Sequence, residues 1–137
     1  MNTRSASAIF IILGSAFALS SAPALSAGNT KFGTNALLSL NGNNNSAFGE
    51  SALRNNTSGY DNTAVGYQSL YTNLIGYQNT ATGSQSLLAN TTGNLNTASG
   101  FDALRRNTTG GSNTATGARS LSIPPVSITQ RQGLVRL

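Results

Sequence analysis

The chain has 137 residues, enough for one domain, with only 8% charged residues and a formal net charge of +5. It contains no Cys, His or Trp, which excludes disulfides and metal sites built on thiolate or imidazole. Small polar residues dominate the middle of the sequence and cannot fill a conventional core, so this part is either disordered or periodic. Of the cations only Arg105 and Arg106 are adjacent, and we expect no nucleic-acid-binding stripe.

Residues 1–27 have the pattern of a secretory signal peptide. Arg4 precedes an apolar stretch over residues 8–19, and small residues continue to Ala27. The apolar stretch is shorter than the roughly 20 residues of a transmembrane helix. Cleavage is expected after Ala22-Pro23-Ala24, or after residue 26 or 27. The mature protein is therefore expected outside the cytoplasm, without an integral membrane segment.

A repeat of 17 residues runs without insertion or deletion from Asn45 to Leu121. Each copy opens with Asn-Thr/Ser-Ala-x-Gly, continues through Ala/Ser-Leu and, where complete, closes on Asn-x-x-Gly. The copies begin at Asn45, Asn62, Asn79, Asn96 and Asn113. A degenerate first copy occupies residues 29–44 and is one residue shorter, so the repeat domain spans residues 28–121.

The consensus predicts an all-β fold, a parallel β-solenoid (β-roll). In Thr-Ala-x the side chains alternate across a strand with Ala inward, and Gly follows where the chain turns. The turn glycines are Gly49, Gly66, Gly83, Gly100 and Gly117. Coils then stack about 4.8 Å apart, so each repeat position becomes a column. The asparagine columns can form amide ladders, and the leucine column is Leu53, Leu70, Leu87, Leu104 and Leu121.

The leucine column predicts an oligomer. One Leu and one Ala per coil supply roughly 2–3 kcal/mol of transfer free energy. Ordering the residues of a coil costs several times that amount before ladder hydrogen bonds are counted. Several chains packed around a shared leucine seam would remove the deficit, and closed symmetry is the usual arrangement. We therefore expect a homo-oligomer.

Residues 122–137 depart from the repeat. They contain the pair Pro124-Pro125, which blocks further ladder pairing, and no repeat consensus. The segment could cap the open edge of the last coil, form a disordered end, or be the stub of a truncated reading frame. No alternating membrane strand can be read in it.

The repeat resembles the head repeats of trimeric autotransporter adhesins and similar arrays in tail-fibre-like proteins. The resemblance covers residues 29–121 and rests on Asn-Thr-Ala-x-Gly and Ala/Ser-Leu followed by Asn-Thr-Thr-Gly. It implies a left-handed parallel β-roll, a homotrimer, and attachment to host surfaces, matrix or other cells. The repeat here is longer than the 14–15 residues typical of the best-known heads, and the stalk and barrel anchor of that family do not follow it.

The sequence offers no catalytic, metal or cofactor site. Its only acids are Glu50, Asp61 and Asp102. Glu50 and Asp102 would lie three coils apart, about 14 Å at the ladder spacing, whereas paired glycosidase carboxylates lie about 5–9.5 Å apart. No His or suitably placed Lys can activate a serine or threonine. We do not expect an enzyme.

Two sets of outward side chains are candidate contacts. Paired hydroxyls on one strand face resemble the Thr-x-Thr face of β-solenoid antifreeze proteins, although Phe48 and Val65 interrupt the array. These hydroxyls are Thr80, Thr82, Thr114 and Thr116. Tyr60 and Tyr77 share a column directly after corner glycines, where aromatics suit contacts with glycans or proteins. The alternative is that they shield the seam or simply vary.

The sequence as a whole favours a secreted or cell-surface structural and adhesive protein, expected at a bacterial outer surface, that presents a repetitive surface to a host or cell-surface protein or glycan. The alternatives are a fibre or matrix component without a specific receptor, a β-solenoid ice-binding protein, and a truncated fragment of a larger autotransporter.

Overall fold

The computed structural model describes residues 28–38 and 41–122. The signal peptide expected over residues 1–27 and all of the C-terminal tail after Ser122 lie outside the described residues. The described part contains six three-residue strands. They are β1 (Thr30–Phe32), β2 (Ser46–Phe48), β3 (Thr63–Val65), β4 (Thr80–Thr82), β5 (Thr97–Ser99) and β6 (Thr114–Thr116). Among the described residues, no helix is long and apolar enough to cross a membrane.

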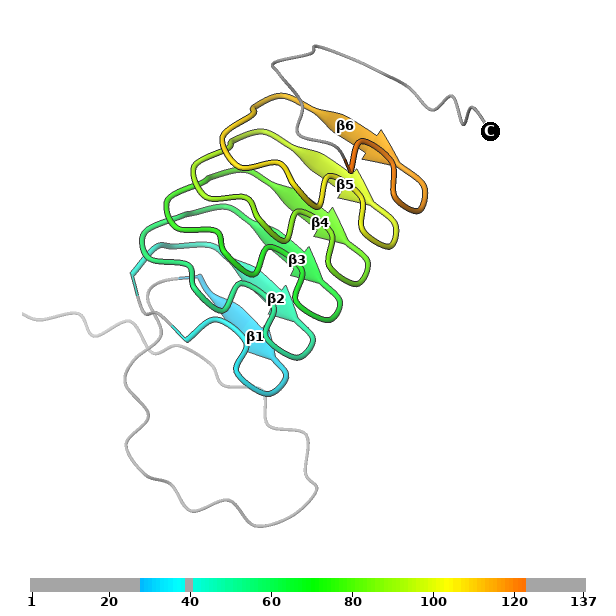
Figure 1. The fold of residues 1–137 in the computed structure, drawn as a ribbon. Coiled ribbons are helices and arrows are strands. Elements are labelled where there is room, and N and C mark those ends of the chain that lie inside the picture. Colours follow the sequence, from blue (N-terminus) through cyan, green and yellow to red (C-terminus); the bar gives the residue numbers. More distant parts are fainter. Residues whose placement is uncertain (1–27, 39–40, 123–137) are drawn as a thin grey trace, which may run out of the picture.

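The strands form one parallel sheet whose order follows the chain, β1-β2-β3-β4-β5-β6. Each residue of β2 pairs with the residue 17 positions later in β3, and this register continues to β6. Figure 1 shows the coils stacked directly on one another, each contributing one strand to the sheet. The fold is therefore the predicted all-β parallel solenoid, of about five turns.

Each strand buries its middle residue and exposes the residue after it, as alternation requires. The alanines at the middle of β2 to β6 are fully buried, whereas Lys31 takes this position in β1 and is exposed. Gly66 ends β3 with a φ of 128°, and a Cβ on it would come within 2.7 Å of the carbonyl carbon and oxygen of Gly83. Glycine is needed there both for the left-handed conformation and for the close stacking of successive backbones.

The leucine column packs inside the single chain, which corrects the prediction of a seam shared between chains. The side chains of Leu37, Leu53, Leu70, Leu87 and Leu104 have no exposed surface, and they form one core cluster with the alanine column. Only Leu121, in the last coil, is partly buried. Because the coil closes around the leucines, the need for a shared seam disappears, and the leucine column gives no argument for a trimer.

The buried leucines adopt a left-handed backbone conformation that the sequence did not predict. Leu53, Leu70, Leu87 and Leu104 have φ values of 50°, 51°, 50° and 51°. This conformation costs an ordinary residue roughly 1–2 kcal/mol. Ladder hydrogen bonds hold the turn in place, for example from Leu70 N to Ser86 O at 3.0 Å and from Leu87 N to Ala103 O at 2.9 Å. Burial of the leucine side chain offsets the strain.

Both asparagine columns form buried amide ladders. In the first, Asn62 Nδ2 donates to Asn45 Oδ1 at 3.1 Å, and Asn62 N donates to the same oxygen at 3.0 Å. In the second, Asn73 Nδ2 donates to Asn56 Oδ1 at 2.8 Å. The same pattern repeats in the following coils. The side chains in both columns are essentially fully buried.

One glycine carbonyl in each coil joins the two ladders. Asn62 Nδ2 and Asn73 Nδ2 both donate to Gly76 O, at 2.8 Å and 2.9 Å. A Cβ on Gly76 would lie 2.3 Å from Asn73 Oδ1, so this corner requires glycine for space. Gly59, Gly93 and Gly110 accept the corresponding pairs of hydrogen bonds.

The two ends of the solenoid differ. Near the start, Lys31 stands where later coils have alanine, and its Nζ donates to Leu37 O at 3.3 Å. An inward-pointing charge of this kind protects a sheet edge from further pairing. In the last coils, Asn107 Oδ1 and Asn113 Oδ1 are buried without a hydrogen-bond partner in the described structure, because both ladders end there. The expected cap for this edge, residues 122–137, lies beyond the described residues apart from Ser122.

Replacing Asn79 with Ala tests the ladder. The variant loses the oxygen that accepts from Asn96 N and Nδ2 at 3.0 Å and 3.1 Å. It leaves a buried backbone N–H without a partner and a small cavity, so we expect a loss of roughly 2–4 kcal/mol in the free energy of unfolding. Urea denaturation measures it. Asn55, an exposed neighbour of the second column, is the control; equal losses in Asn55→Ala and Asn79→Ala would contradict the ladder.

Replacing Leu87 with Ala tests the leucine core. We expect the free energy of unfolding to fall by roughly 2–5 kcal/mol, the usual range for a fully buried leucine. Leu95 is a matched control, because its φ of 59° is also left-handed while 52% of its surface is exposed. Leu95→Ala should change the free energy of unfolding by less than about 0.5 kcal/mol. Similar losses in both variants would show that backbone strain, not burial, governs the position.

Candidate binding surfaces

The acids remain apart in the folded chain. Glu50 follows β2, Asp61 lies in the corner before β3, and Asp102 follows β5. Asp61 Oδ1 accepts from Asn44 Nδ2 at 3.0 Å, which gives it a structural partner. Among the described residues, no group of three or more metal-ligating side chains occurs. Candidate function therefore lies on the outward surfaces of the coils.

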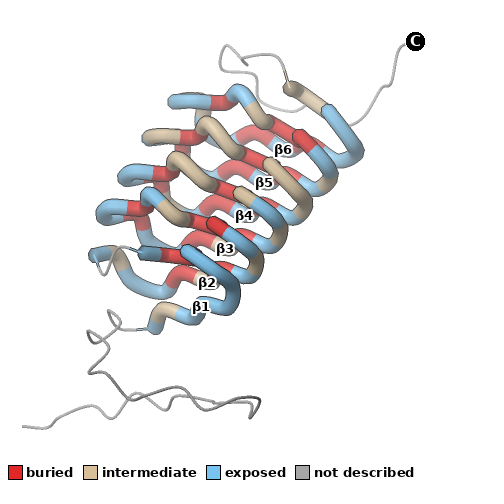
Figure 2. Tube along the Cα trace, turned by 60° about the horizontal axis from the view of Figure 1, so that its bottom comes forward, coloured by how far each residue is buried: buried red, intermediate tan, exposed pale blue. Residues whose placement is uncertain are grey.

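The first surface is the strand face, formed by the residues on either side of the buried alanine in each strand. Over β4 to β6 it presents only hydroxyls, and all are exposed: Thr80, Thr82, Thr97, Ser99, Thr114 and Thr116. The strand register places them in two straight columns, and Figure 2 shows exposed segments flanking the buried ones along the coils. The four predicted threonine contacts lie together on this flat array.

The same face is apolar over β1 to β3. Phe32, Phe48 and Val65 occupy one column, with exposed fractions of 75%, 40% and 38%. The register pairs Phe32 with Phe48 and Phe48 with Val65. The strand face is thus divided along the solenoid axis into an apolar half and a hydroxyl half.

The two corner tyrosines stack on each other. The ring centroids of Tyr60 and Tyr77 lie 4.9 Å apart, and the ring planes differ by 2°. Tyr77 N donates to Asn94 Oδ1 at 3.0 Å, so an asparagine continues the column in the next coil. Because the leucine seam is closed inside the chain, these rings do not shield it. They form a small aromatic ledge at a corner.

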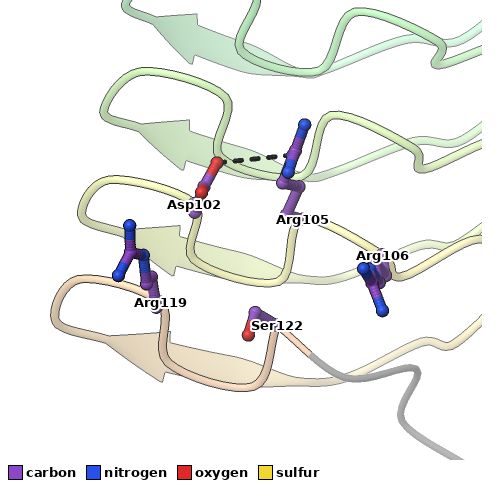
Figure 3. A pocket seen from close by; sticks show the side chains of 5 residues that line it. All are labelled: Asp102, Arg105, Arg106, Arg119 and Ser122. Atoms are coloured by element: carbon purple, nitrogen blue, oxygen red, sulfur yellow. Dashed lines mark ion pairs between the residues drawn. The ribbon is translucent and has the colours of Figure 1, made fainter.

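A basic cluster was not predicted from the sequence. Figure 3 shows a pocket of about 330 Å³ on the turns that follow β5 and β6. Its lining, which we name the arginine pocket, consists of Asp102, Arg105, Arg106, Arg119 and Ser122. Arg119 stands alone in the sequence, but it lies one 17-residue coil after Asp102, and Ser122 lies one coil after Arg105. Aligning the cations by the repeat period would have revealed the cluster.

Asp102 holds one of the pocket arginines. Arg105 Nε lies 3.4 Å from Asp102 Oδ1, an ion pair too long for a good hydrogen bond. Asp102 is 8% exposed, and its Oδ1 has no hydrogen-bond partner in the described structure. The guanidinium carbon of Arg119 lies 5.7 Å from the ring centroid of Phe101, within cation–π range. Two of the three arginines are therefore positioned by neighbours.

The sequence has no significant match among protein families, curated proteins or solved structures. The likeness to adhesin heads consequently rests on the repeat pattern.

A double-mutant cycle on Tyr60 and Tyr77 tests the aromatic ledge. Each change to Ala should lower the free energy of unfolding, and the coupling between the two should be about 0.5–1.5 kcal/mol, as for other stacked aromatic pairs. Thermal or urea unfolding of the two single variants and the double variant measures the coupling. Additive losses would contradict an energetically significant stack.

Proposed function

We propose that this protein is a secreted or cell-surface structural and adhesive protein that attaches to host surfaces, matrix or other cells through the strand face. The supporting observation is the exposed array of β4 to β6, a regular row of side chains that no described part of the chain covers. Residues 1–27, with their signal-peptide pattern, support export.

The division of labour within each coil also supports a display role. Alanine, leucine and asparagine carry the interior, so the outward position after the buried alanine changes freely. That position passes through Phe, Phe, Val, Thr, Ser and Thr from β1 to β6 without any change in register. A scaffold of this type presents an extended repetitive surface.

Attachment is tested with microspheres coated with the full chain, placed on cells and on immobilised matrix proteins. We expect coated spheres to attach, and the pair Thr97→Glu and Thr114→Glu to reduce attachment several-fold by charging the strand face. The matched control pair is Thr92→Glu and Thr109→Glu, which are equally exposed, one coil apart and away from the strands. Attachment no better than bare spheres, or an equal loss in the control pair, would contradict the proposal.

Ice binding is a second candidate function, favoured by the flatness of the hydroxyl array. Hydroxyls two residues apart on a strand are about 7 Å apart, and those on neighbouring strands about 4.8 Å apart. If this lattice binds ice, the purified protein produces thermal hysteresis, and Thr97→Glu with Thr114→Glu abolishes it. The absence of hysteresis at millimolar concentration would eliminate this function.

We also propose a homotrimer, now through the apolar half of the strand face. Phe32, Phe48 and Val65 are the exposed apolar column that self-association would bury. Analytical ultracentrifugation of the full chain is expected to give a trimer, and Phe32→Ser with Phe48→Ser should shift it to monomer. A folded monomer at micromolar concentration in the unchanged protein would contradict this assembly.

A further inference from the structure

We propose that the arginine pocket binds an anionic sugar unit, a carboxylated or sulfated residue of an acidic polysaccharide. The site lies on the turns after β5 and β6 and is separate from the strand face. It does not rest on the proposed adhesive function.

The charge of the pocket favours an anion. It brings three guanidinium groups and one carboxylate together within two adjacent coils, in a chain with few charges. Asp102 pairs with Arg105, so the charges of Arg106 and Arg119 are left to the ligand. Both of these side chains are exposed, and within the described part of the chain neither guanidinium takes part in a hydrogen bond or an ion pair. Each guanidinium offers five N–H donors in a planar fork that fits carboxylate and sulfate oxygens.

The pocket also asks for a hydrogen-bond donor from its ligand. Asp102 Oδ1 is buried, lines the pocket and lacks a hydrogen-bond partner among the described residues. A simple anion cannot supply a proton to this oxygen, whereas a sugar hydroxyl next to an acidic group can. The combination of free guanidiniums and an unsatisfied carboxylate oxygen therefore points to a ligand with both an anionic group and hydroxyls.

Size and shape agree with one sugar ring. The pocket volume of about 330 Å³ is at the small end of ligand sites. Phe101, 44% exposed, lies beside Arg119 and supplies an apolar surface at the edge. The C–H face of a sugar ring packs on such a surface while its acidic group reaches the arginines.

The test is binding of the full chain to soluble polymers at low salt. We expect binding to polygalacturonate, which carries carboxylates, or to dextran sulfate, which carries sulfates, and the tighter of the two identifies the acidic group. Neutral dextran should not bind. Polyacrylate, matched in charge but without hydroxyls, should bind at least fivefold more weakly than the better of the two sugar polymers.

Arg106→Gln and Arg119→Gln should each weaken binding about fivefold or more, since both groups contact the anion. Their folds should persist because both side chains are exposed, and thermal unfolding checks this. Arg54→Gln is the control: it removes the same charge from a residue that instead donates to Tyr71 Oη at 3.1 Å, outside the pocket. It should change binding less than twofold. Equal loss in Arg54→Gln, equal binding of polyacrylate, or preferred binding of duplex DNA would each overturn the proposal.

Discussion

The buried asparagine amide is the group on which the rest of this solenoid depends. An amide placed away from water must satisfy one oxygen and two N–H groups, and here the stacked coils supply every partner. In the middle of the stack, Asn79 Nδ2 donates to Asn62 Oδ1 and to Gly93 O, while its own oxygen accepts from the next coil. Because an unsatisfied buried polar group costs about 1–3 kcal/mol, each coil fixes the position of its neighbours.

The other constraints of the coil follow from this arrangement. Asparagine side chains can reach one carbonyl from two sides only if the corner that bears it has no side chain, which is why Gly76 and its counterparts are glycines. The remaining interior is small, and one leucine and one alanine from each coil fill it. The interior is thus determined by a few positions, and the outward positions are left to carry hydroxyls, aromatic rings or arginines.

The sequence predicted the fold because the repeat period reports the register directly. Residues 17 apart had to share a column, and this was enough to predict the parallel strands, the inward alanines and the asparagine ladders. It did not predict the left-handed φ of Leu70, since leucine gives no local signal for that conformation. Without that turn, the leucine side chains were placed on a surface shared between chains, when they close inside one chain.

The candidate sites were predicted unevenly for the same reason. Columns of identical residues, such as the threonines of β4 and β6, were visible in the consensus. The arginine pocket was missed because its members differ in type and occupy different repeat positions. Asp102 and Arg119 meet only when the chain is wound with its period, and no pattern of like residues announces them.

The most direct test of this account is hydrogen exchange of the asparagine side-chain amides, followed by NMR. The Nδ2 protons of Asn62, Asn79 and Asn90, in central coils, should exchange only through opening of the stack, orders of magnitude more slowly than those of exposed Asn55. Equal exchange rates for the ladder amides and for Asn55 would contradict the claim that buried amide ladders hold the solenoid together.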